Sequence, residues 1–181
     1  MKNLIKQILK EYAEEQEKVL VIPSLKIFNY DWNALQQFLK SRGNPKWKIL
    51  GNLNLTDYSV ESLENLTFVG GNLNLENSPI KSLGNLKSIE GYLNLNNTSI
   101  ISLGNLESVS GNMNLSNTPI KSLGNLTSVG GYLNLERSAA ESFGNLQSVG
   151  DYLNLYGTPL SQKYSREEIR QMVNVSERIY K

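Results

Sequence analysis

The chain has 181 residues, and its 18 basic and 17 acidic residues give a net charge of +1. This length suits one domain with a substantial core, and the balanced charge predicts no long-range attraction to nucleic acid, anionic membranes or acidic substrates. The sequence contains neither cysteine nor histidine. Disulfides, thiolate chemistry and thiol or imidazole metal sites are therefore excluded, and we expect no metal and no cofactor.

The first twenty residues predict an amphipathic helix, in which Leu4, Ile5, Ile8, Leu9 and Tyr12 recur at helical spacing opposite three lysines. This stripe is not the continuous apolar run of a secretory signal, and no segment reaches the roughly 18 to 20 apolar residues of a membrane span. We expect a cytoplasmic protein, in a bacterial host if a phage encodes it. The helix is expected to cap the domain; docking in a partner's groove and self-association are the alternatives.

A second helix is predicted to follow Asp31, which has the residue type and position of an N-cap, and to end before Gly43 and Pro45. Its apolar side chains recur at helical spacing; they are Trp32, Leu35, Phe38 and Leu39. Residues 1–50 are therefore interpreted as a helical N-terminal cap or docking segment, which leads into the first strand at Trp47 and Ile49.

A twenty-residue repeat begins at residue 51 and continues without insertion. Position one of successive units is Gly51, Gly71, Gly91, Gly111, Gly131 and Asp151. The apolar positions of one unit are Leu93, Leu95, Ile100, Leu103, Leu106 and Val109. Because one unit cannot bury six such residues alone, neighbouring units must stack so that each apolar column becomes part of a continuous core. Residues 51–162 are therefore predicted to form a solenoid.

The L-N-L triplet of each unit alternates with a period of two, which predicts a short strand with both leucines facing inward. A twenty-residue coil has no room for a strand, two corners and an α-helix, and Pro79, Pro119 and Pro159 favour corners on the return side. We therefore expect a mainly β solenoid of about six coils with one parallel sheet and no helices on its back.

The spacing L-x-x-L-x-x-V-x-G-x-L-x-L-x-x-T-x-I resembles leucine-rich repeats, in the short variant of receptor L domains and of repeat proteins of bacteria and tailed phages. The resemblance covers residues 51 to about 160 and implies a partner-binding scaffold. The asparagine expected after the strand is often replaced, as by Ser78, Thr98 and Thr118. This departure points to a cross-section closer to a β-helix than to a horseshoe.

Residues 163–181 are predicted to cap the far end of the solenoid, where bare strands would otherwise be exposed. Ser165 and Glu168 match a capping box, which predicts a short helix that contains Ile169, Met172 and Val173.

Position four of each unit is asparagine, and these side chains are predicted to face outward as a ladder of hydrogen-bonded amides. Position two, on the same face, is asparagine in three units and tyrosine in the other three. The sequence brings Tyr132, Tyr152 and Tyr156 together near the C-terminal end, and tyrosine beside asparagine is typical of recognition surfaces. The residues predicted to contact a partner are Tyr92, Asn94, Asn114, Tyr132, Asn134, Glu136, Tyr152, Asn154 and Tyr156.

The repeat argues against catalysis, because a catalytic site needs unlike groups that converge and a regular ladder supplies like ones. The serines at Ser62, Ser82, Ser102, Ser122 and Ser142 have no histidine to activate them. We therefore predict a non-enzymatic protein-interaction scaffold, such as an accessory or inhibitor protein of a phage or bacterium. A glycan-binding module that uses the same tyrosines and asparagines is the alternative, and the absence of a basic stripe argues against nucleic acid.

Overall fold

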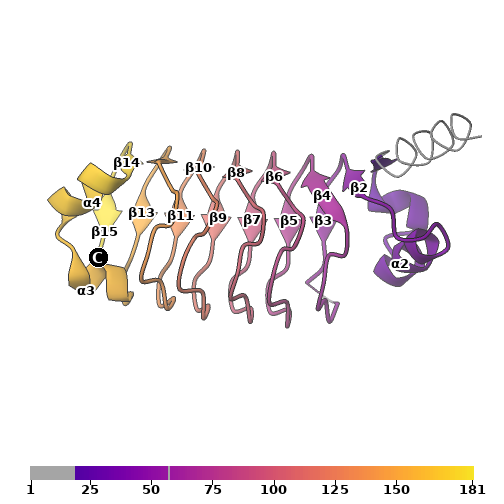
Figure 1. The fold of residues 1–181 in the computed structure, drawn as a ribbon, viewed down its shortest axis with the longest axis horizontal. Coiled ribbons are helices and arrows are strands. Elements are labelled where there is room, and N and C mark those ends of the chain that lie inside the picture. Colours follow the sequence, from indigo (N-terminus) through magenta and orange to yellow (C-terminus); the bar gives the residue numbers. More distant parts are fainter. Residues whose placement is uncertain (1–18, 57) are drawn as a thin grey trace, which may run out of the picture.

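The computed structural model describes residues 19–56 and 58–181, which form a solenoid with helices at both ends (Figure 1). The helix predicted over residues 1–20 lies outside the described residues, apart from its last two positions. The parallel β solenoid predicted from the repeat is confirmed, with one L-N-L strand every twenty residues.

The N-terminal cap contains β1 (Leu20–Ile22), the 3-10 helix η1 (Leu25–Phe28) and α2 (Trp32–Lys40). Asp31 caps α2 as predicted, because its Oδ1 accepts hydrogen bonds from the backbone N–H groups of Asn33 and Ala34 at 2.8 and 3.2 Å. The buried side of α2 consists of Trp32, Leu35 and Leu39. The second predicted helix is therefore confirmed.

The six repeat triplets and the C-terminal strand β15 form a seven-stranded parallel sheet. From β3 to β13, leucine pairs with leucine or methionine, and asparagine pairs with asparagine. Its strands are β3 (Leu53–Asn54), β5 (Leu73–Asn74), β7 (Leu93–Asn94), β9 (Met113–Asn114), β11 (Leu133–Asn134), β13 (Leu153–Asn154) and β15 (Ile179–Tyr180).

A second parallel sheet, of eight strands, lies on the return side of the coils. Besides β1 it contains β2 (Trp47–Ile49), β4 (Leu66–Val69), β6 (Ser88–Ile89), β8 (Ser108–Val109), β10 (Ser128–Val129), β12 (Ser148–Val149) and β14 (Asn174–Val175).

The expectation of a single sheet is therefore corrected to two sheets. The physical reason is that backbone groups on the return side also need partners. The next coil supplies them, as where the Ser110 N–H donates to the Ile89 carbonyl at 2.8 Å. Two sheets facing each other across the coil give the β-helix-like cross-section to which the substituted asparagines pointed.

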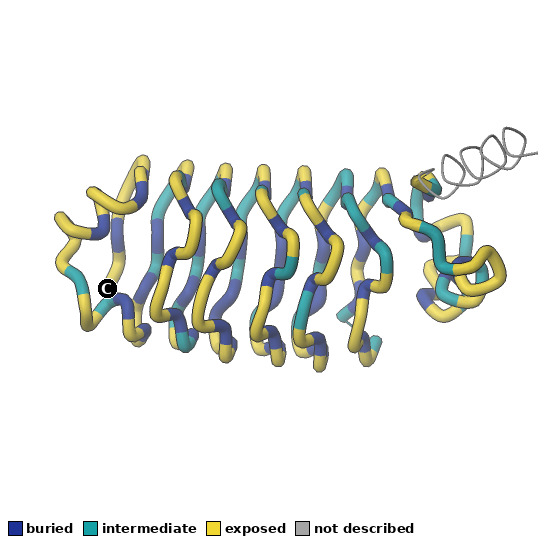
Figure 2. Tube along the Cα trace, viewed as in Figure 1, coloured by how far each residue is buried: buried dark blue, intermediate teal, exposed yellow. Residues whose placement is uncertain are grey.

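One hydrophobic core runs the length of the solenoid between the two sheets. The apolar columns predicted from the repeat are all buried, and Leu93, Leu95 and Ile100 are completely inaccessible to solvent. Figure 2 shows buried segments recurring in every coil, with exposed segments at the corners. Since each coil buries the same columns, stacking supplies the burial that a single unit lacks.

The C-terminal cap begins with α3 (Pro159–Lys163) and α4 (Arg166–Met172). Ser165 and Glu168 form the predicted capping box, and the hydrogen bonds from Ser165 lower the pKa of the Glu168 carboxyl. The chain then adds a final strand to each sheet.

Two arginines of α4 cover the edges of these strands. Arg166 Nε donates to the Ile179 carbonyl at 2.9 Å, and Arg170 donates to the carbonyls of Val175 and Glu177 at 2.9 and 2.6 Å.

Candidate binding surface

The outward side of the seven-stranded sheet carries positions two, four and six of each coil, which we call the Asn/Tyr face. At position four the asparagine Oδ1 accepts the backbone N–H two residues later in the same coil. The six distances lie between 3.0 and 3.3 Å. The predicted amide ladder is wrong for this column, since no hydrogen bond joins two of these asparagines in the described residues. A short amide reaches the N–H of its own turn first.

The amide nitrogens of the position-four column have different environments. Asn94 Nδ2 donates to Glu76 Oε2 at 3.1 Å and Asn154 Nδ2 to Glu136 Oε2 at 3.5 Å. Asn94 is also buried. Asn114 and Asn134 are half-buried, and within residues 19–56 and 58–181 their Nδ2 groups form no hydrogen bond. The Nδ2 groups of Asn114 and Asn134 are therefore better placed to donate a hydrogen bond to a ligand than the Nδ2 group of Asn94.

At position two, asparagine joins successive coils. The Oδ1 atoms of Asn52, Asn72 and Asn112 accept the backbone N–H of position two in the next coil, at 2.8, 2.9 and 3.1 Å. The acceptor oxygen of a tyrosine lies at the far end of the ring, too far from the backbone to make the same bond. Tyr92 and Tyr132 therefore give up a hydrogen bond that other coils make, and the stacking of coils does not by itself require them.

The position-two asparagines also explain several glycines at position one. A Cβ atom on Gly71, Gly91 or Gly131 would lie 2.3, 2.3 or 2.0 Å from the Oδ1 of the asparagine in the preceding coil. Asp151 is the non-glycine residue at position one, and the coil before it carries Tyr132 at position two. Positions one and two of neighbouring coils are thus linked by close packing.

Tyrosine rings pack against one another at the C-terminal end of this face. The Tyr132 and Tyr152 rings stack with centroids 4.9 Å apart and planes 9° apart, and Tyr180 meets Tyr152 edge to face at 5.6 Å. Tyr156 is 59% exposed, and its ring does not stack on this group. The sequence predicted the proximity of Tyr132 and Tyr152 but missed Tyr180, which lies outside the twenty-residue period.

Burial raises the pKa of the Tyr92 and Tyr152 hydroxyls above the ordinary tyrosine value. The nearby Tyr132 raises both further, as does Glu76 for Tyr92 and Asp151 for Tyr152. Both hydroxyls are therefore protonated at neutral pH and can donate as well as accept a hydrogen bond. The remaining predicted residue, Glu136, has its Oε1 3.7 Å from Arg137 Nε.

The hollows on this face lie toward its N-terminal end. One of about 220 Å³ is bordered by Tyr92 and four asparagines; its lining is Asn52, Leu53, Asn54, Asn72, Asn74 and Tyr92. A second, of about 580 Å³, lies between the first coil and the cap and shares Asn52 and Asn54 with the first; its lining is Leu25, Tyr30, Asn52, Asn54 and Tyr58. The sequence placed the candidate site nearer the C-terminal tyrosines and gave no sign of these hollows.

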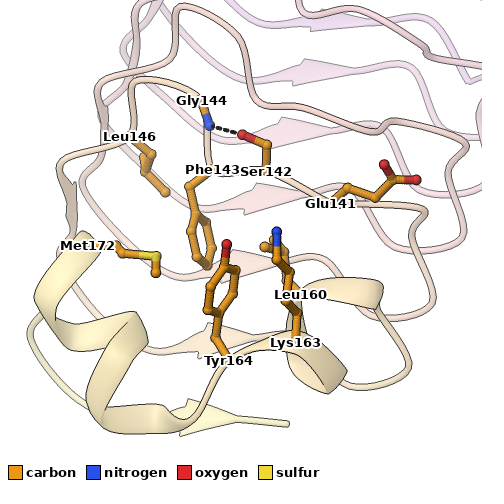
Figure 3. Close-up of a pocket in the computed structure, with 9 residues that line it drawn as sticks. All are labelled: Glu141, Ser142, Phe143, Gly144, Leu146, Leu160, Lys163, Tyr164 and Met172. Carbon is orange, nitrogen blue, oxygen red and sulfur yellow. Dashed lines mark hydrogen bonds between the residues drawn. The ribbon is translucent and has the colours of Figure 1, made fainter.

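A separate pocket of about 290 Å³ lies between the C-terminal cap and the last full coil (Figure 3). Phe143, Tyr164 and Met172 project into it, and the Gly144 N–H donates to Ser142 Oγ at 3.0 Å at its rim. None of its lining residues belongs to the Asn/Tyr face. Within the described part of the chain, no group of three or more acidic residues could hold a metal ion.

In residues 19–56 and 58–181, no helix is both long and apolar enough to cross a membrane. Comparison with curated proteins and with solved structures finds no match. The Toastrack DUF4097 family model matches residues 47–152, more than half of the 181 residues and most of the two-sheet solenoid. The chain therefore belongs to the Toastrack DUF4097 family.

Proposed function

We propose that this protein is a non-enzymatic scaffold that binds another protein through the Asn/Tyr face. The observation that carries the proposal is the tyrosine substitution at position two. In the coils of Tyr92 and Tyr132, an aromatic ring replaces an asparagine that elsewhere hydrogen-bonds to the next coil. A tyrosine at position two removes a hydrogen bond between coils, so another favourable interaction must compensate for it. In this proposal, contact of the ring with a partner is part of that compensation.

The chemistry of the face supports a protein partner. Stacking restricts the rings of Tyr132 and Tyr152 before binding, so less conformational entropy is lost when a partner packs against them. Tyrosine also offers a large apolar area with a polar tip, a combination enriched in the residues that dominate interface energies. The free amide donors of Asn114 and Asn134 would add directional hydrogen bonds.

The proposal also draws on the resemblance of the repeat spacing to leucine-rich repeats. This resemblance supports the same class of function, because leucine-rich repeat proteins mostly serve as partner-binding scaffolds. We include in it a cytoplasmic location and an accessory or inhibitory role in a phage or bacterium. The balanced composition and the absence of histidine and cysteine favour binding over catalysis.

The test replaces Tyr132 and Tyr152 with alanine, because an asparagine at position 132 would place its amide oxygen against the Cβ of Asp151, as Asn112 would for a Cβ on Gly131. The tagged protein is used to capture partners from its native host, which mass spectrometry identifies, and the affinity of the purified pair is then measured. We expect the double variant to fold normally and to bind at least tenfold more weakly. Lys121→Ala, an exposed change at a corner of the solenoid, is the matched control and should bind normally. Full affinity of a folded double variant would rule the face out.

A glycan is the second candidate, and one observation favours it. The hollow of about 220 Å³ sets four asparagine side chains beside the Tyr92 ring, and amides next to an aromatic ring can hydrogen-bond to and stack on a sugar. A glycan array with the wild type and with Tyr92→Asn would decide between the two. Selective binding that the Tyr92 change abolishes would favour the glycan, and an array without signal would leave the protein partner.

A further inference from the structure

The seven-stranded sheet ends at β3, and among residues 19–56 and 58–181 no strand pairs with the outer side of β3. The N–H groups of Leu53 and Leu55 donate to Asn72 and Asn74 of the next coil at 2.8 Å each. Because successive residues of a strand direct their backbone groups to opposite sides, the N–H and carbonyl of Asn54 and the carbonyl of Asn52 face away from β5.

In the inner coils the equivalent carbonyls are used. The carbonyls of Tyr92 and Asn94, for example, accept the N–H groups of Leu73 and Leu75 at 2.8 and 2.9 Å. Within residues 19–56 and 58–181, no hydrogen bond reaches the carbonyl of Asn52 or of Asn54. Both side chains are exposed. The outer side of β3 therefore offers two acceptors and one donor at the spacing of a strand.

The two edge strands of this sheet differ in what covers them. At the C-terminal edge, the Arg166 side chain bonds to the Ile179 carbonyl of β15 and covers it. At the N-terminal edge the eight-stranded sheet continues through β1, whose Ile22 pairs with Ile49. The chain after β1 then forms η1, and a helix cannot offer its backbone to β3. The N-terminal cap thus extends one sheet and leaves the other open.

A preformed hollow of about 580 Å³ lies beside the open edge of β3. Its apolar wall is made by Leu25, Tyr30 and Tyr58, and none of the described residues that line it is charged. The wall is held in place, because the Tyr58 hydroxyl donates to the Tyr30 carbonyl at 3.0 Å and accepts the Trp32 N–H at 3.4 Å. Tyr30 itself is 63% exposed, so its ring remains available for contact.

We propose that β3 accepts an extended, uncharged segment of the partner protein as an additional parallel strand, with an apolar side chain in this hollow. The proposal rests on the proposed function only in taking the partner to be a protein. Two carbonyl acceptors about 6.6 Å apart along a strand match the N–H groups of residues i and i+2 of an extended peptide, a pattern that a sugar does not repeat. The C-terminal end of a second copy does not fit, because Arg166 covers its edge.

The first experiment measures amide hydrogen exchange in the free protein. The Asn54 N–H faces the open edge, whereas the Asn74 N–H lies in an inner strand between β3 and β7. We expect the Asn54 amide to exchange at least a hundredfold faster than the Asn74 amide. Equal protection of the two amides would mean that the edge is already covered, and the proposal would fall.

The second experiment uses a synthetic peptide with the sequence GYLNLNN, which is residues 91–97 of this chain. As an added coil, its first and second leucines would donate their N–H groups to the carbonyls of Asn52 and Asn54. We expect saturable NMR shifts at Asn54 and slower exchange of its amide. A control peptide N-methylated at both leucines keeps the side chains, lacks the two donors, and should bind at least tenfold more weakly. No shift at millimolar peptide, or equal binding of both peptides, would overturn the proposal.

A matched pair of variants tests the hollow. Tyr30→Lys places a charge at the edge, a device by which natural sheets block strand addition, and should weaken the peptide at least tenfold. Ile101→Lys introduces the same charge at an apolar side chain of similar exposure, 61%, outside the Asn/Tyr face, and should leave peptide binding unchanged. Equal effects of the two variants would contradict a site at β3.

These results are separable from the test of the Asn/Tyr face. If the peptide binds and the Tyr132→Ala, Tyr152→Ala variant keeps its partner, the edge stands and the C-terminal face fails. If the peptide does not bind and the double variant loses its partner, the edge fails and the face stands. A dimer in analytical ultracentrifugation that protects the Asn54 amide would also overturn the proposal, because a second copy would then occupy the edge.

Discussion

The two sheets of the solenoid have the same inward face and different outward faces. Inward, both carry columns of leucine, isoleucine and valine that are buried in one core. Outward, the eight-stranded sheet repeats a small residue, which is Ser88, Ser108, Ser128 and Ser148 in successive coils. The seven-stranded sheet instead carries asparagine at position four and a mixture of asparagine and tyrosine at position two.

This comparison separates the needs of a coil from those of a partner. A column that is the same in every coil is explained by something that every coil needs, as the position-four asparagine is by the N–H that it accepts. A column that changes along the solenoid, as position two does at Tyr92 and Tyr132, needs a local explanation. The comparison predicts that inward changes cost stability in both sheets and that outward changes cost stability only where they remove a hydrogen bond.

The largest expected effect is at the shared core. Leu133→Ala should lower the free energy of unfolding by about 2–5 kcal/mol, because it leaves a cavity at a fully buried site of the seven-stranded sheet. Val129→Ala, in the other sheet, removes fewer buried atoms and should cost about 2 kcal/mol. Urea unfolding followed by circular dichroism measures both. A near-neutral Leu133→Ala would contradict the single core.

A smaller effect should distinguish the two outward faces. Asn134→Ala leaves the Glu136 N–H without its acceptor and should cost about 0.5–1.5 kcal/mol. Ser128→Ala changes the outward column of the eight-stranded sheet, where no side-chain hydrogen bond of Ser128 occurs in the described residues, and should stay within about 0.5 kcal/mol. The same urea titration applies to both. Equal costs would mean that the asparagine column is not explained by its turn.

The smallest effect is the pH dependence of the tyrosine group. The pKa of Tyr152 is raised by burial, and further by Tyr132, above the value of about 10 expected in the unfolded chain. The neutral hydroxyl thus contributes stability that is fully present below about pH 10 and is lost as the pH rises through the folded-state pKa. Tyr152→Phe should lose less stability than the wild type as the pH rises above about 10. A parallel loss in both proteins would show that Tyr152 titrates as it does when unfolded.

The fold could largely be predicted from the sequence, because the twenty-residue period fixes the inward columns and local signals fix the caps. Asp31 and the Ser165 and Glu168 pair marked helix starts that the structure confirms. The second sheet could not be predicted, because its strands in the inner coils, β6, β8, β10 and β12, each consist of one serine followed by one valine or isoleucine. Two residues are too few to show an alternation, and a small polar residue is equally typical of a corner.

The candidate site could be predicted only in part. The register placed Tyr132 beside Tyr152, since equal positions in successive coils lie next to each other. Tyr180 also contacts Tyr152, but it follows two helices and lies outside the twenty-residue repeat, so the register could not place it. Only Ile179, the apolar residue before it, resembles the strand pattern. The hollow near Leu25 and Tyr30 depends on how the cap packs on the first coil, which no repeat specifies.

The contact between a position-two asparagine and the following position-one glycine has a consequence for engineering longer arrays. A coil that begins with Asp151 cannot be inserted after one that carries Asn112, because its Cβ would enter the space of the amide oxygen, as a Cβ on Gly131 would at 2.0 Å. Modules of this protein are therefore exchangeable only as matched junctions. A designer who duplicates or shuffles coils should cut between positions one and two, as between Gly111 and Asn112, so that a pair such as Asn112 and Gly131 travels together.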